Sequence, residues 1–144
     1  MAQRYTEISS MSKVLNKLTG IIIGCAIEEY RSLVPGLPGS AYQDCLVFEL
    51  EQKAISVSRQ IPVPVVYKDI KLDYGYRIEI LAENLVVLEL KVADEINPVN
   101  VAKILTCMNF SGKSVGLLIN FTLQLLRMVS EDTCYKINFS SGPQ

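Results

Sequence analysis

Two glutamates and one lysine on neighbouring predicted strands carry the clearest chemistry in this sequence. Glu89 and Lys91 lie two residues apart in an apolar run at residues 86–91, and Glu79 lies in the preceding run at residues 76–81. Because side chains of a strand alternate between its two faces, Glu89 and Lys91 share one face. Carboxylate oxygens bind hard cations such as Mg²⁺, which can polarise a phosphodiester and supply hydroxide. A neighbouring lysine can steady the attacking water or the developing negative charge.

The connection between the two runs decides whether Glu79 joins this pair. Directly opposed residues of an antiparallel pair point to the same side, so Glu79 faces Glu89 only if the loop has an odd number of residues. A three-residue loop at residues 82–84 pairs Glu79 with Val87. The same register pairs Arg77 with Glu89 and gathers both acids, the arginine and the lysine in one patch, whereas a two-residue loop scatters them.

The apolar side chains of this hairpin are predicted to form its opposite, buried face. They are Ile78, Ile80, Val86, Leu88 and Leu90. A solvated face with an incidental ion pair is the alternative interpretation of Glu79, Glu89 and Lys91, because exposed charged residues are common. The context supplied by the rest of the chain therefore has to decide between the two interpretations.

Length and composition indicate one ordinary globular domain. The chain has 144 residues, of which 49% are hydrophobic and 20% are charged, and this length suffices to bury a sizeable core. The formal net charge is -1, so no global basic field favours tight non-specific binding of nucleic acid. The predicted organisation is a flexible N-terminal arm at residues 1–11 followed by a single domain at residues 12–144.

Histidine is absent and the cysteines are scattered along the chain. The four cysteines, none of them in a C-x-x-C pair, are Cys25, Cys45, Cys107 and Cys134. Zinc fingers, His-based catalytic triads and H-E-x-x-H metal sites are thereby excluded, and reduced, buried thiols are expected. The sequence has neither a signal peptide nor an apolar run long enough to span a membrane. We therefore expect a soluble, cytoplasmic protein with no membrane partner.

Hydrophobic periodicity and turn residues predict helices and strands in an alternating order. In chain order we expect a helix at 12–33, a helix at 41–53, strands at 55–59 and 62–67, a turn at 68–73, strands at 76–81 and 86–91, a helix at 98–110 and a strand at 115–121. In the tail we expect a helix at 123–129 and a strand at 135–139. The nearly unbroken apolar run at 115–121 is typical of a strand buried on both faces.

The order of these elements resembles the core of the PD-(D/E)XK nuclease superfamily. That core has a helix, a three-stranded antiparallel meander, a crossover helix and a further strand in a mixed sheet flanked by helices, and its meander carries an acid followed by Glu-x-Lys. Within the superfamily, the chain resembles the small GxxExxY proteins over residues 12–125. The matching residues are Gly24-Cys25-Ala26-Ile27-Glu28, Pro35-Gly36-Leu37, Ser40-Ala41-Tyr42, residues 61–72, Tyr76-Arg77, Val87-Leu88-Glu89-Leu90-Lys91, Asn97-Pro98-Val99 and residues 116–121.

This resemblance implies an α/β (α+β) fold and a Mg²⁺-dependent nuclease, with Mn²⁺ as the alternative ion. Glu79 and Glu89 would bind the metal. Glu28 would support the metal or position water, and Lys91 would assist the nucleophile. The implied substrate is DNA or RNA.

Several positions depart from the family pattern. Gly39 stands where the family has the glutamate of its name, and Glu79 stands where it has an aspartate. Lys103 and Cys107 replace a glutamine and a tyrosine of the crossover helix, and Tyr30 replaces a histidine. Small misplacements of catalytic groups reduce rates strongly, so the longer side chain at position 79 could abolish activity.

Two functions therefore remain open at the level of sequence. One is a Mg²⁺-dependent phosphodiester hydrolase of weak or lost activity, which the intact Glu-x-Lys favours. The other is a catalytically inactive nuclease-fold module that binds nucleic acid or protein, which the substitutions favour. A homo-oligomer or a protein partner is compatible with both, and an ordinary structural module is a third interpretation.

Overall fold

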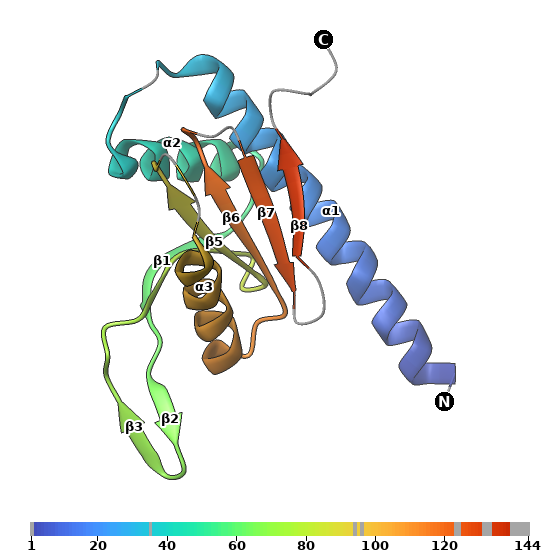
Figure 1. The fold of residues 1–144 in the computed structure, drawn as a ribbon. Coiled ribbons are helices and arrows are strands. Elements are labelled where there is room, and N and C mark those ends of the chain that lie inside the picture. The colour runs from blue at the N-terminus through green and yellow to red at the C-terminus, as the bar shows by residue number, and fades with distance from the viewer. Residues whose placement is uncertain are drawn as a thin grey trace.

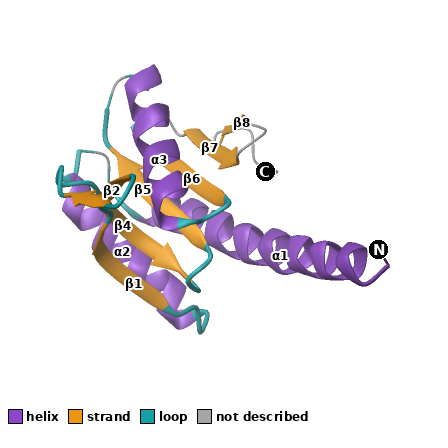
Figure 2. Ribbon diagram, turned by 90° about the horizontal axis from the view of Figure 1, so that it is seen from below, coloured by secondary structure: helices purple, strands orange, loops and turns teal. Residues whose placement is uncertain are grey.

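The chain forms a mixed β-sheet with helices on both faces (Figure 1, Figure 2). The computed structural model describes residues 2–34, 36–93, 95, 97–122, 125–130 and 134–138. In chain order the elements are α1 (Ala2–Ser32), α2 (Gly39–Gln52), β1 (Val57–Pro62), β2 (Val65–Tyr67), β3 (Ile70–Leu72), β4 (Arg77–Ala82), β5 (Val86–Lys91), α3 (Pro98–Ser111), β6 (Val115–Asn120), β7 (Leu125–Ser130) and β8 (Cys134–Asn138). Within these ranges, no helix combines the length and the apolar character that crossing a membrane requires.

The main sheet has the strand order β1-β4-β5-β6-β7-β8. Its neighbours are antiparallel except for β5 and β6, which run parallel. The crossover helix α3 joins these two strands, because parallel neighbours cannot be connected by a tight turn. The predicted fold, with a three-stranded antiparallel meander, a crossover helix and a further strand, is confirmed. The strands β2 and β3 form a separate two-stranded ribbon, inserted in the chain between β1 and β4.

The first helix is longer than the periodicity predicts. It begins at Ala2 and spans 31 residues, and Figure 1 shows its N-terminal half extending away from the sheet. Residues 2–11, predicted as a flexible arm, continue the same helix. No proline or glycine interrupts the chain before Gly20, so nothing in the local sequence stops the helix earlier.

The crossover helix α3 is defined at both ends by its local sequence. Pro98 is its first residue, as predicted, and the preceding Asn97 exchanges side-chain to backbone hydrogen bonds with Asn100 in a capping box. Gly112 ends the helix with a left-handed φ of 71°. Fixed ends hold the side chains of α3 in register with the sheet.

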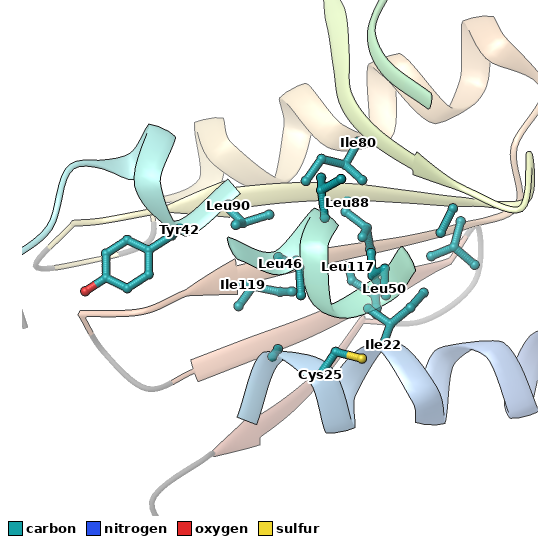
Figure 3. Packing of buried hydrophobic residues seen from close by; sticks show 14 of the residues in the cluster. Ile22, Cys25, Tyr42, Leu46, Leu50, Ile80, Leu88, Leu90, Leu117 and Ile119 are labelled. Atoms are coloured by element: carbon teal, nitrogen blue, oxygen red, sulfur yellow. The ribbon is translucent and has the colours of Figure 1, made fainter. Parts of the chain in front are cut away.

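Two apolar cores lie on opposite faces of the sheet. On one face α1 and α2 pack against β4, β5 and β6, where Leu46, Leu88 and Leu117 are fully buried (Figure 3). On the other face α3 packs against the sheet through Ile104 and Met108. The strand β6 is therefore covered on both faces, as its unbroken apolar sequence predicts.

A single glycine sets how closely α3 approaches β6. A Cβ atom at Gly116 would lie 2.8 Å from Met108 Sδ and 2.9 Å from Ile104 Cδ1, and both separations are too short for van der Waals contact. Any larger residue would push α3 away from the sheet or force the two side chains to move.

The predictions for two short segments are wrong. Residues 125–129, predicted as part of a helix, belong to β7, which pairs antiparallel with β6. Residues 70–72, predicted as part of a turn, form β3. Short apolar runs fit either a helix or a strand, and for β7 the open edge of β6 selects the strand. The predicted strand at 135–139 is confirmed as β8, while residues 123, 124 and 139 lie outside the described residues.

A buried carboxylate lies between α1 and α2. Glu29 is 3% exposed, and neither of its carboxylate oxygens has a hydrogen-bond partner among the described residues. Burial, and to a lesser degree the charge of Glu49, raises the pKa of Glu29 to about 8. Glu29 is therefore mostly protonated at neutral pH, which avoids the cost of an unpaired buried charge.

We expect the free energy of unfolding to decrease as the pH rises from about 5 to 8. The unfolded chain releases the Glu29 proton near its ordinary pKa of 4.5, whereas the folded chain holds it to about 8, so rising pH favours the unfolded state. Glu29→Gln should remove about 3 kcal/mol of this dependence. Chemical denaturation at several pH values measures it, and the exposed neighbour provides the control Glu28→Gln. Equal pH slopes for Glu29→Gln and wild type would contradict the protonated state.

Candidate active site

The turn between β4 and β5 sets the register of the hairpin. The pairing begins at Ala82 and Val86, so the loop consists of Glu83, Asn84 and Leu85. Glu83 and Asn84 have left-handed φ angles of 52° and 57°, and Leu85 N donates to Ala82 O at 2.9 Å. The loop therefore has an odd number of residues, which is the condition under which Glu79 and Glu89 were predicted to point to the same side of the hairpin. The loop lies one residue later than predicted.

Extended by one pair beyond Ile80 and Leu88, the shifted register would place Glu79 opposite Glu89 instead of Val87. The pairing of β4 with β5 ends at Ile80 and Leu88, next to Glu79. Beyond this pair the two strands are no longer joined by backbone hydrogen bonds. Leu90 N donates its hydrogen bond to Glu79 Oε2 at 3.2 Å. The carboxylate of Glu79 therefore lies at the point where the two strands separate.

The alternation of side chains along β4 also changes at Glu79. Ile80 packs in the core beneath α1 and α2, whereas Ile78 packs in the core beneath α3. Five apolar residues of the hairpin were predicted to share one buried face. The prediction is wrong for Ile78, and it is correct for Ile80, Val86, Leu88 and Leu90. The neighbouring strand is irregular at the same level, because Gln60, which lies opposite Glu79 in the β1–β4 register, has a φ of 52°.

Glu79 is held by two donors and is half-buried. Gln43 on α2 donates from Nε2 to Glu79 Oε2 at 3.1 Å, beside the bond from Leu90 N. Burial raises the pKa of Glu79, the Leu90 N–H group lowers it, and the charge of Glu89 raises it again. Two nearby lysines lower it to a smaller extent. The net direction is upward, because the effect of burial outweighs the Leu90 N–H group and the two lysines.

Glu89 is the most buried charged group of the site. It is 6% exposed, and its Oε1 lies 3.3 Å from Lys91 Nζ and 3.5 Å from Lys103 Nζ. Both contacts are ion pairs, and Oε1 accepts no hydrogen bond from any described residue. The two ammonium groups therefore compensate the charge of Glu89, while Oε1 remains a buried acceptor without a hydrogen bond among the described residues.

The helix α3 brings Lys103 and Cys107, one turn apart, to the carboxylates. Cys107 Sγ lies 3.9 Å from Arg77 O, to which it donates. Burial, and then the charge of Glu89, raises the pKa of the Cys107 thiol. From this helix, Lys103 therefore supplies a cation and Cys107 a neutral thiol.

Comparison with known protein families identifies the superfamily of this chain. The family model of the PD-(D/E)XK nuclease superfamily matches residues 16–132, which include the whole site. The chain belongs to the PD-(D/E)XK nuclease superfamily. Comparisons with curated proteins and with solved structures gave no significant match. The resemblance drawn from the order of elements is confirmed at the level of the superfamily.

Glu28 lies outside the gathered residues of this PD-(D/E)XK domain. It is exposed on α1 and lines a hollow with Glu49 and Lys53 at the C-terminal end of α2. Glu79 contacts the opposite end of α2, about 9–15 Å away along the helix axis. The expectation that Glu28 approaches the face of Glu79 is therefore wrong. Arg77, also expected in the patch, is exposed in the β1–β4 pair.

Gln43 is the residue of the site that sequence reasoning missed. It lies within the helix predicted at residues 41–53, but periodicity does not say which residue of that helix reaches the hairpin. Lys103 was recognised as a departure from the family pattern, whereas its ion pair with Glu89 depends on how α3 lies on the sheet.

The donor set fits a hard divalent cation, the type of metal that PD-(D/E)XK nucleases generally use. Glu79 and Glu89 provide carboxylate oxygens, and Glu89 Oε1 is a buried acceptor without a hydrogen bond among the described residues. Mg²⁺ is commonly held by one or two carboxylates together with several waters. Larger groups of three or more His, Cys, Asp or Glu ligands do not occur in the described part of the chain. Lys103 is a competing cation at the same oxygen.

We expect Lys103→Gln to strengthen Mn²⁺ binding by about fivefold to tenfold. The substitution removes an ammonium 3.5 Å from Glu89 Oε1, and the partial exposure of Lys103 limits the electrostatic gain to about 1 kcal/mol. Titration calorimetry or Mn²⁺ electron paramagnetic resonance measures the affinity. Lys113→Gln is the matched control, because Lys113 Nζ contacts Asn84 Oδ1 at the hairpin turn. Equal affinities for Lys103→Gln and wild type would show that Lys103 does not compete with the metal.

Proposed function

We propose that this chain is a GxxExxY-type member of the superfamily that hydrolyses phosphodiester bonds in nucleic acid with Mg²⁺ or Mn²⁺. The observation that carries the proposal is the convergence of Glu79, Glu89 and Lys91 at the separation of β4 and β5. An incidental ion pair needs only one carboxylate. Two carboxylates in one partly buried place repel each other, and a bound cation offsets that repulsion.

The residues of the site have distinct roles in this reaction. Glu79 is fixed through Oε2 by the amide of Gln43 and by the N–H group of Leu90, which orients the carboxylate. Lys91 Nζ lies 3.3 Å from Glu89 Oε1, where it can orient the attacking water and offset charge on the phosphate. When bound, a divalent cation supplies Lewis-acid polarisation of the phosphodiester and lowers the pKa of water.

The start of α2 supports the assignment to GxxExxY proteins. Tyr42, at the tyrosine position of that pattern, stacks on Phe121 with ring centroids 4.5 Å apart. Gly39 occupies the glutamate position, and Gln43 follows one helical turn later on the same side of the helix. Because Gln43 reaches Glu79, a neutral amide provides a contact from α2 to the hairpin acid even though the glutamate is missing.

One contact favours a second function, an inactive nuclease-fold module that binds nucleic acid or protein. Lys103 Nζ lies 3.5 Å from Glu89 Oε1, so an ammonium already supplies part of the positive charge that a metal would bring. With Lys91 on the same oxygen, Glu89 is compensated without any metal. The two functions differ in whether metal addition leads to cleavage that depends on Glu89.

We expect slow cleavage of nucleic acid by the wild type, faster with Mn²⁺ than with Mg²⁺. Mg²⁺ requires nearly ideal octahedral geometry, which the longer Glu79 side chain is less suited to provide. Glu89→Ala should reduce the rate by about a hundredfold or more, and Glu79→Asp should raise the Mg²⁺-supported rate. The assay uses labelled single- and double-stranded DNA and RNA, with the exposed Glu51→Ala as the matched control.

Two outcomes would change this proposal. Cleavage that persists undiminished in Glu89→Ala would assign the activity to something other than this site. Absence of cleavage on every substrate, both by wild type and by a folded variant carrying Glu79→Asp, Lys103→Gln and Cys107→Tyr, would favour the binding module. Circular dichroism and thermal melting establish that each variant is folded.

A further inference from the structure

A hollow of about 260 Å³ lies between the end of α1 and the middle of α2. Three of the described residues that line it are acids, namely Glu29, Asp44 and Glu49, and none of them is a lysine or an arginine. Its walls also carry hydrocarbon, from Leu33 and from the ring of Phe48, which is 59% exposed. The hollow therefore combines acidic groups with apolar surface.

Glu29 is the acid of this hollow whose hydrogen bonding is incomplete. It is 3% exposed, and both Oε1 and Oε2 lack a hydrogen-bond partner among the described residues. Buried polar groups are nearly always paired, and leaving one unpaired costs free energy. Asp44, by contrast, already forms an ion pair with Arg59 at 2.8 Å. The carboxyl group of Glu29 is thus the acceptor that a ligand in the hollow would satisfy.

The surroundings of Glu29 favour a positively charged ligand. The titratable and charged groups around it are Cys25 and Glu28 on α1 and Asp44, Cys45, Glu49 and Lys53 on α2. Burial raises the pKa of both thiols, which are therefore neutral, and the charge that acts on Glu29 is that of Glu49. Lys53 lies in the adjoining hollow and does not lower the pKa of Glu29. Within the described structure, a cation is therefore the group that Glu29 lacks.

An organic cation fits the hollow better than a metal ion. In the part of the chain that the structure describes, no three His, Cys, Asp or Glu residues converge closely enough to hold a metal. Leu33 and Phe48 instead provide walls for a hydrocarbon stem, and the face of an aromatic ring attracts an ammonium group. We propose that this hollow binds an unbranched alkylammonium ion, whose charged end contacts the carboxylate of Glu29.

Binding exchanges the proton of Glu29 for the ammonium group. Glu29 is mostly protonated at neutral pH, because burial raises its pKa to about 8. The alkylammonium ion keeps its own proton, since such groups titrate at about pH 10, so the carboxyl proton passes to the buffer. A free amine and the lysine side chain of a partner protein offer this same chemistry. The proposal does not depend on whether the domain is a nuclease.

Heteronuclear NMR titration of the isotope-labelled full chain with n-pentylammonium chloride tests the proposal. The ligand is small, so we expect millimolar affinity and shifts centred on residues 29–33 and 44–49. Because one proton is displaced, the affinity should increase about tenfold per pH unit between about pH 6 and 7 and level off above about pH 8. Glu29→Gln should remove this pH dependence and weaken binding at least about tenfold at about pH 8.5. The exposed neighbour provides the control Glu28→Gln, which should change neither.

Two further comparisons separate charge, ring and source of the ligand. The neutral n-pentanol, of the same length, should bind much more weakly than n-pentylammonium. Phe48→Leu should weaken n-pentylammonium binding by about twofold to fivefold. Nα-acetyl-lysine methylamide, which carries the same ammonium on a peptide backbone, should bind comparably if the natural ligand is the side chain of a partner and should be excluded if it is a free amine.

Each of three results would overturn the proposal. Equal affinities for n-pentanol and n-pentylammonium would show that the hollow is merely apolar. A pH dependence that Glu29→Gln retains would place the cation elsewhere. Absence of binding by both ammonium ligands at millimolar concentrations would leave Glu29 a buried acid without a ligand. Thermal melting of each variant establishes that it is folded.

Discussion

The hydrogen bond from Leu90 N to Glu79 Oε2 is the contact on which the site depends. A backbone N–H group inside a sheet must find an acceptor, and here a side-chain carboxylate provides it just beyond the end of the β4–β5 pairing. The strands can separate without leaving that donor unpaired. The separation in turn gives Gln43 of α2 access to Glu79, and it leaves Glu89 and Lys91 at its margin. Glu79 therefore has a structural role as well as a chemical one.

Desolvation acts on two glutamates of this protein and is compensated differently in each. Glu29 has no hydrogen-bond partner among the described residues, and its pKa rises to about 8, so it takes up a proton. The pKa of Glu79 also rises, but a backbone N–H group and two lysines oppose the increase. At Glu79 a hydrogen-bond donor and two cations therefore oppose the effect of burial, whereas the contact between α1 and α2 provides no such group for Glu29.

The helix α3 connects the fold to the charge balance of the site. Its distance from β6 depends on the missing side chain of Gly116, and its start is fixed by the capping box at Asn97. Held in this way, α3 presents Lys103 to the oxygen that also contacts Lys91. The same oxygen is the proposed ligand of a metal ion, so the position of α3 determines how strongly Lys103 competes with that ion. The β2–β3 ribbon lies outside this arrangement and adds a separate surface.

The sequence by itself determined most of the elements between residues 12 and 121 and the fact that Glu89 and Lys91 share a face. Both follow from local periodicity, because a strand alternates its side chains whatever lies next to it. The superfamily was recognised instead from the resemblance of motifs and of their order along the chain. Only the tertiary structure decided that Gln43 reaches Glu79, that Glu28 does not, and that residues 125–130 pair with β6 as a strand. These outcomes depend on contacts between segments far apart in the chain. Local patterns specify which face a side chain occupies, but the packing of helices and strand edges decides which neighbour that face meets.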